Sequence, residues 1–121
     1  MDKKVLIIED YPATVEMIIS YMESLHGYAL DFALDGPSGL AKIDSNKPDV
    51  VLLDIMMPGM SGLDVCKKLK GDPKTSKIPI IIVSAKVSDD DIKAGMAAGA
   101  EEYLTKPFDM NKLVELIKKY I

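Results

Sequence analysis

Short apolar runs alternate along this chain with longer segments in which apolar residues recur every three or four positions. Uninterrupted apolar runs are typical of strands that are buried on both faces of a parallel sheet. Strands that alternate with helical segments indicate βα units, so the pattern predicts an α/β domain around a parallel sheet. The expected strands are Val5–Ile8, Tyr28–Ala33, Val50–Leu53, Ile80–Val83 and a weaker Glu102–Leu104.

Between these strands, the sequence contains residues that are typical of the beginnings and ends of helices. A proline suits the first turn of a helix, Ser or Asp caps its N-terminus, and glycine often follows its C-terminus. The acidic triplet Asp89–Asp91 complements the positive end of a helix dipole, so it requires no functional explanation. The five expected helices begin near Pro12, Asp35, Gly62, Ser88 and Met110, and they extend to about His26, Lys47, Leu69, Gly99 and Tyr120.

The composition is that of a globular protein. Of 121 residues, 48% are apolar and 28% are charged, a balance that supports one hydrophobic core. We therefore expect residues 1–121 to form one domain. Glu9 and Asp10 interrupt the N-terminal apolar segment before it reaches the length of a signal peptide, and no later stretch could span a bilayer. A cytoplasmic location without membrane insertion is the expectation.

Charge and rare residues exclude several classes of function. Fifteen basic against 19 acidic side chains give a net charge of −4, which argues against tight binding to a nucleic-acid backbone. Cys66 and His26 are the only residues of their types, so the chain contains no internal disulfide and no multi-Cys or multi-His metal site. A bound metal would need oxygen ligands.

Polar residues follow the expected strands where each one ends. Glu9 and Asp10 follow the first strand, and Asp54 follows the third. Ser84 ends the fourth, and Lys106 lies just after the fifth. Because ligands of parallel α/β sheets bind beyond the carboxyl ends of the strands, we expect these side chains to converge on one rim.

Three carboxylates at one rim repel one another. A hard divalent cation with oxygen ligands neutralises such a group, with Lys106 as a fixed counter-charge, and magnesium is the expected ion. An aspartate beside these cations can act as a nucleophile toward a phosphoryl group, because they stabilise charge on the transferring oxygens. The expected product is an aspartyl phosphate on Asp54.

The motifs in combination resemble a known family. They are Glu9-Asp10, Asp54 with Met57-Pro58-Gly59 and Gly62 behind it, Ser84-Ala85, and Lys106-Pro107-Phe108. Over its whole length the chain resembles the receiver domains of two-component response regulators. The resemblance implies a flavodoxin-like fold, which is a doubly wound five-stranded parallel sheet in strand order 2-1-3-4-5 with five helices.

The resemblance also implies a metal site and an acceptor. Asp54 would be the phosphoacceptor, and Asp10 and Asp54 would bind magnesium directly. Glu9 would bind the ion through water, and Met56 would bind it through its backbone carbonyl.

Three further residues receive roles from the same resemblance. Lys106 would pair with the phosphoryl group, and Ser84 would reach toward that group after phosphorylation. Tyr103 matches the switching aromatic, which turns inward when the hydroxyl moves. The family also suggests a cis Lys106-Pro107 peptide bond, a constrained link that is almost confined to proline.

Two variable positions bear on the lifetime of the phosphoryl group. In the family, the side chains two residues after the acceptor and two after the hydroxyl residue flank the hydrolytic water. Here they are Met56 and Lys86, and neither is suited to orient water for attack. We therefore hypothesise slow self-hydrolysis, with Met56 excluding water and Lys86 stabilising the phosphoryl charge.

The implied function is a phosphorylation-activated signalling switch. Its phosphoryl group would come from a histidine kinase or a phosphotransfer protein. It is not expected to be a classical enzyme, since it would catalyse only its own phosphorylation and dephosphorylation. A downstream protein would bind the surface of the fourth helix, fifth strand and fifth helix, and homodimerisation through the fourth and fifth helices is a further option. Direct binding of nucleic acid is not expected.

Other interpretations are left open. Ending at Ile121, directly after the last expected helix, the chain looks like a stand-alone receiver, and the alternative is a fragment of a longer regulator with an output domain. A phosphate-independent interaction module usually lacks part of the acidic cluster or the lysine. A magnesium-dependent phosphatase generally carries a second Asp where this chain has Met56.

Overall fold

Five parallel strands form one sheet at the centre of the molecule. The computed structural model describes residues 2–121. The strands are hydrogen-bonded in the order β2-β1-β3-β4-β5, which confirms the predicted fold class and strand order. Their bounds are β1 (Lys3–Ile8), β2 (Tyr28–Ala33), β3 (Val50–Leu53), β4 (Ile80–Ser84) and β5 (Glu102–Thr105).

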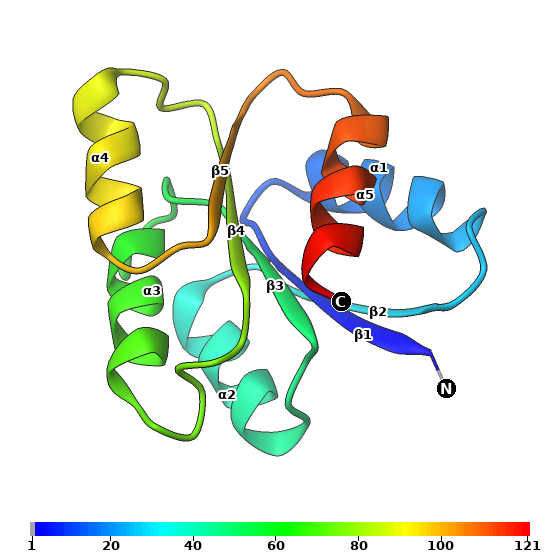
Figure 1. Cartoon of the computed structure of the whole chain (residues 1–121), viewed down its shortest axis with the longest axis horizontal. Coiled ribbons are helices and arrows are strands. Elements are labelled where there is room, and N and C mark those ends of the chain that lie inside the picture. Colours follow the sequence, from blue (N-terminus) through cyan, green and yellow to red (C-terminus); the bar gives the residue numbers. More distant parts are fainter. Residues whose placement is uncertain (1) are drawn as a thin grey trace.

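Helices cover both faces of the sheet. Figure 1 shows α1 and α5 together on one face, and α2, α3 and α4 on the other. Within residues 2–121, no helix is long and apolar enough to cross a membrane. The bounds are α1 (Pro12–Glu23), α2 (Gly36–Ser45), α3 (Gly62–Gly71), α4 (Asp89–Ala97) and α5 (Met110–Tyr120).

Helix α1 ends at Glu23, before the predicted end at His26. The N–H of Leu25 donates to the carbonyl of Met22, a three-residue spacing that tightens the chain out of α-helical geometry. Gly27 then takes a φ of 105° and turns the chain into β2. The other four helices end within two residues of the predicted positions, and Gly99 lies just beyond α4 with a φ of 107°.

The hydrophobic core has one part on each face of the sheet. Strands β3 and β4 are buried along their whole length, as their uninterrupted apolar runs predicted. On one face, α5 contributes Leu113 and Ile117, and on the other face α3 contributes Val65, Cys66 and Leu69. Close packing on both faces fixes the strands, and with them the residues that follow their carboxyl ends.

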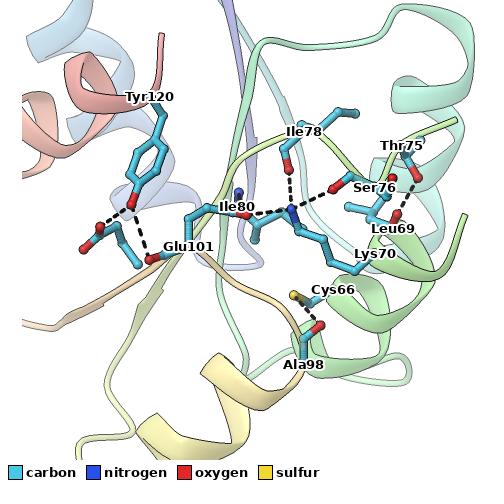
Figure 2. A network of polar contacts seen from close by, with 11 residues as sticks. Cys66, Leu69, Lys70, Thr75, Ser76, Ile78, Ile80, Ala98, Glu101 and Tyr120 are labelled. Carbon is cyan, nitrogen blue, oxygen red and sulfur yellow. Dashed lines mark hydrogen bonds and ion pairs between the residues drawn. The ribbon is translucent and has the colours of Figure 1, made fainter. Parts of the chain in front are cut away.

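At the other end of the sheet, where β4 and β5 begin, one lysine joins several elements (Figure 2). The Lys70 ammonium donates to the carbonyls of Ser76 and Ile78 at 3.0 and 2.9 Å and to the Glu101 carboxylate at 2.9 Å. The same carboxylate accepts from the N–H of Ile80 at 2.7 Å. These contacts tie α3 to the start of β4 and to the turn before β5.

Candidate functional site

Sheet-like backbone hydrogen bonds continue one residue beyond the ends of the strands. They fix the backbone of the residues at the carboxyl ends of the sheet. The N–H of Asp54 donates to the carbonyl of Ile8 at 2.9 Å, and the N–H of Lys106 donates to that of Ser84 at 2.8 Å. Glu9 is held in the same way by the last residue of β2 at 3.0 Å. Each of these candidate side chains therefore starts from backbone that is fixed by hydrogen bonds.

Three carboxylates converge at this rim. Glu9, Asp10 and Asp54 each offer an oxygen that lies within 4.8 Å of the others. Glu9 is 3% exposed and Asp54 is 5% exposed, so water screens their repulsion only weakly. Burial raises the pKa of Glu9, Lys106 opposes this rise, and the nearby Asp54 adds to it.

Lys106 supplies the positive charge that faces these acids. Its Nζ lies 2.5 Å from Oε1 of Glu9 and 3.7 Å from Oδ2 of Asp54. The sequence predicted that Lys106 is the counter-charge of the acids. It did not predict that the Lys106 ammonium lies closer to Glu9 than to Asp54. One ammonium leaves the three acids with excess negative charge, and their oxygens are the ligands that a hard divalent cation prefers. The donor set therefore fits magnesium.

The loop after β3 approaches α3 very closely. A Cβ on Gly62 would lie 2.0 Å from the carbonyl oxygen of Asp54, so only glycine fits at the start of α3. The N–H of Gly62 donates to the carbonyl of Ile55 at 2.9 Å. Met56 donates its N–H to Oδ1 of Asp54 at 3.3 Å, while its side chain is 53% exposed. The exposed Met56 side chain thus lies beside the buried carboxylate of Asp54.

Ser84 and Tyr103 meet at the backbone of Lys86. The fully buried Ser84 accepts the N–H of Lys86 on its Oγ at 3.1 Å. The Tyr103 hydroxyl donates to the carbonyl of the same residue at 2.6 Å. No sequence signal pointed to Lys86 in this role, because its backbone makes both contacts. The arrangement connects the rim hydroxyl to an aromatic side chain on β5.

Tyr103 is half-buried between β5 and its neighbours. Burial raises the pKa of its phenol, the nearby Ser84 hydroxyl lowers it, and the negative charges of Asp91 and Asp54 raise it further. The Lys106–Pro107 peptide bond is cis, which confirms that prediction.

The sequence of this chain matches a known family. The model of the response regulator receiver domain matches residues 5–118. PilH from Pseudomonas aeruginosa is 40% identical over 114 residues, which are 94% of this chain and 93% of PilH. The response regulator PleD from Caulobacter vibrioides is 39% identical over 109 residues, which are 90% of this chain and 24% of PleD. The chain thus spans about a quarter of PleD and nearly all of PilH.

The fold also matches solved structures. The structure of the chemotaxis protein CheY4 from Vibrio cholerae superposes with a TM-score of 0.90 at 28% sequence identity. The match covers 100% of this chain and 100% of that one. The similarity therefore extends over the sheet, all of the helices described above and the rim.

Proposed function

This chain belongs to the response regulator receiver domain family, and on that premise we propose that Asp54 is the residue through which it is switched by phosphorylation. Receiver domains of this family are signalling switches and not classical enzymes. They interact with histidine kinases or phosphotransfer proteins. The observation that carries the proposal is the group of three carboxylates within 4.8 Å that faces one lysine.

Asp54 is the proposed nucleophile. One of its carboxylate oxygens forms a bond to phosphorus, while the bond from phosphorus to the donor's imidazole nitrogen breaks and the imidazole keeps the electron pair. The position of Asp54 at the mouth of the core supports this role, because it follows β3 and its neighbouring side chain Met56 is exposed. The N–H of Met56 orients the carboxylate.

Magnesium is the proposed cofactor, held by Asp10 and Asp54 directly, by Glu9 through water and by the backbone carbonyl of Met56. When bound, the ion supplies charge stabilisation to the transferring phosphoryl oxygens. Lys106 adds a fixed positive charge 3.7 Å from Asp54. Because its ammonium also pairs with Glu9 at 2.5 Å, it is already oriented toward the acceptor.

The switch proposal involves Ser84 and Tyr103. Ser84 reaches toward the phosphoryl group and gives up the N–H of Lys86, and Tyr103 responds through the carbonyl of that residue. Both contacts exist on one peptide segment, which supports a mechanical connection between them. Phosphorylation then acts as a local change of charge and packing that biases one loop and one aromatic side chain.

The proposed output surface consists of α4, β5 and α5, where a downstream protein binds and where a homodimer is the alternative. We propose that residues 1–121 act as one receiver domain. The alternative of a receiver within a longer regulator is supported by PleD, of which the chain spans 24%. The cytoplasmic location and the absence of direct nucleic-acid contact stay predictions.

Labelling with a small phosphodonor tests the acceptor. Wild-type protein incubated with acetyl phosphate and magnesium should gain the mass of one phosphoryl group. Asp54→Asn should gain none, and Asp44→Asn, which changes an exposed aspartate on α2, should behave as the wild type. Equal labelling of Asp54→Asn would show that the nucleophile is wrongly assigned.

Two alternative functions have their own tests. A magnesium-dependent phosphatase would release phosphate continuously from a colorimetric substrate, and we expect no such turnover because Met56 stands where the second aspartate of those enzymes would be. A phosphate-independent interaction module would not bind magnesium. A magnesium-induced rise in melting temperature in the wild type would therefore exclude that second alternative.

A further inference from the structure

Helix α4 passes unusually close to Tyr103 at one position. A Cβ on Gly95 would lie 2.8 and 2.9 Å from Cδ2 and Cε2 of the Tyr103 ring. It would also lie 2.9 Å from Cδ1 of Ile82. Real Cβ atoms essentially never approach other heavy atoms below 3.0 Å. The ring of Tyr103 therefore occupies the space that any other residue at position 95 would need.

Local helix energetics do not explain this glycine. Gly95 lies in the interior of α4 and is buried, and glycine is the least favourable residue there apart from proline. The positive-φ glycines of the described chain are Gly27, Gly59 and Gly99, so the backbone at position 95 does not require glycine. Alanine would improve the helix itself. What glycine provides here is space.

We propose that Gly95 is a positioning residue for Tyr103: the bare Cα of α4 forms the seat of the ring, and this seat holds the hydroxyl on the carbonyl of Lys86. The ring lies against Gly95 on one side, and its hydroxyl lies 2.6 Å from the carbonyl oxygen. The phenol ring is rigid. If a side chain at position 95 displaced the ring, the hydroxyl would move away from the carbonyl of Lys86. The seat thus couples α4 to the loop after β4.

The coupling extends to the rim. The N–H of Lys86 donates to Oγ of Ser84 and its carbonyl accepts from the Tyr103 hydroxyl, so the rim hydroxyl and Tyr103 both hold the backbone of Lys86. The seat itself is independent of the function proposed above. Only its effect on phosphorylation rests on that function.

A double-mutant cycle tests the seat. Gly95→Ala should lower the melting temperature by roughly 5 °C, because the methyl group overpacks against the ring. In a Tyr103→Ala background, the same substitution should cost nothing or stabilise, since the ring is gone and alanine favours the helix. An equal loss in both backgrounds would overturn the proposal and assign the clash to Ile82.

Gly71→Ala is the matched control. Gly71 is the last residue of α3, and a Cβ there would meet nothing within 4 Å, so its melting temperature should stay level or rise. If Gly95→Ala fails to fold while the double variant folds, the coupling is present in a stronger form. Failure of both would contradict the proposal.

A spectroscopic readout separates positioning from simple packing. Burial raises the pKa of Tyr103, so ¹³C-labelled tyrosine resonances, with Tyr103 assigned by the signal missing in Tyr103→Phe, should titrate at lower pH in Gly95→Ala. The Lys86 and neighbouring amide signals should shift with it. Gly71→Ala should leave both unchanged. An unchanged Tyr103 titration in Gly95→Ala would show that the ring keeps its place and would overturn the proposal.

Phosphorylation tests the coupling to the rim. With acetyl phosphate and magnesium, wild type and Gly95→Ala should gain the same mass, but the shift of the α4 amide signals should be smaller in Gly95→Ala. An equal shift would overturn the coupling. If the wild type is not labelled, the proposed function fails, whereas the titration and the double-mutant cycle still decide the seat.

Discussion

At the residue scale, the chemistry of each reactive side chain depends on what surrounds it. Asp54 is buried, whereas the side chain of Met56, two residues later, is 53% exposed, so we expect the access of water to the proposed acceptor to depend on Met56. Cys66 is chemically similar to many reactive thiols, yet it lies within the core and its Sγ contacts the carbonyl of Ala98 at 3.5 Å. Environment distinguishes a reactive group from an inert one.

We predict that the phosphoryl group on Asp54 is long-lived because Met56 and Lys86 cannot orient a water molecule. Met56→Asn combined with Lys86→Glu supplies an amide and a carboxylate that can, so the first-order decay should become roughly tenfold faster. Loss of label from ³²P-phosphorylated protein measures the rate. Met17→Asn with Lys67→Glu, exposed positions on α1 and α3, is the control. Faster decay in the wild type would contradict the prediction.

We predict that Cys66 does not react with Ellman's reagent at pH 8 in the native protein. Burial raises the pKa of its thiol from 9.0 to about 11, so roughly a hundredfold less thiolate is present, and the core excludes the reagent as well. In denaturant, one thiol per chain should react at once, because this is the only cysteine. Rapid labelling of native protein would mean that the α3 face of the core opens readily.

At the scale of elements, the two ends of the parallel strands carry different polar interactions. The carboxyl ends of the strands carry the polar groups of the proposed site. The amino ends carry the Lys70 network, which joins α3, β4 and the turn before β5 (Figure 2). The Lys70 and Glu101 side chains are only 16% and 30% exposed. Partly buried, multiply bonded charges contribute more to stability than isolated surface pairs do. This end of the sheet therefore anchors the segments whose other ends form the rim.

We predict that Lys70→Met lowers the free energy of unfolding by about 2 kcal/mol. Methionine keeps an unbranched apolar side chain of similar length but removes the donor to two carbonyls and to Glu101. Lys67→Met, at an exposed position on the same helix, is the matched control and should change little. Urea unfolding followed by circular dichroism measures both. Equal effects of the two substitutions would mean that the network adds nothing beyond helix composition.

At the scale of the whole molecule, a functional site opposes the stability of the fold. The core would be most stable with apolar or neutral residues at the rim, but Glu9, Asp10 and Asp54 place three acids there against one ammonium. Repulsion among partly desolvated carboxylates destabilises the folded chain until a cation is bound. Magnesium bound to these acids would therefore be thermodynamically linked to folding.

We predict that Asp10→Asn raises the melting temperature by roughly 2–5 °C in buffer with chelator, because it removes one of three repelling charges. The same variant should lose most of the stabilisation that magnesium gives to the wild type. Glu115→Gln removes one exposed negative charge from α5 and should leave both quantities unchanged. A lower melting temperature for Asp10→Asn in chelator would contradict the repulsion argument.

The sequence was a good guide wherever a local pattern has one structural solution. The apolar run Val50–Leu53 gave β3 with its bounds as observed, because such a run is stable where both faces of a sheet are covered. The segment Tyr28–Ala33 gave β2 with its bounds as observed as well, although this edge strand is largely exposed. The convergence of Asp54, Ser84 and Lys106 followed from the same fact, since parallel strands end at one edge. Gly62 was recognised only as part of a motif, and the 2.0 Å approach to the Asp54 carbonyl supplies its physical reason.

By itself the sequence determined the elements, the parallel sheet and the residues at its carboxyl end, because these depend on hydrophobic periodicity and on chain direction. The strand order followed from the family resemblance. Only the tertiary structure decided which atoms meet: that Lys106 lies closer to Glu9 than to Asp54, and that Tyr103 rests on Gly95. These contacts join residues distant in the chain through distances of a few ångströms. No periodicity encodes such distances, because they are set by how helices and strands pack.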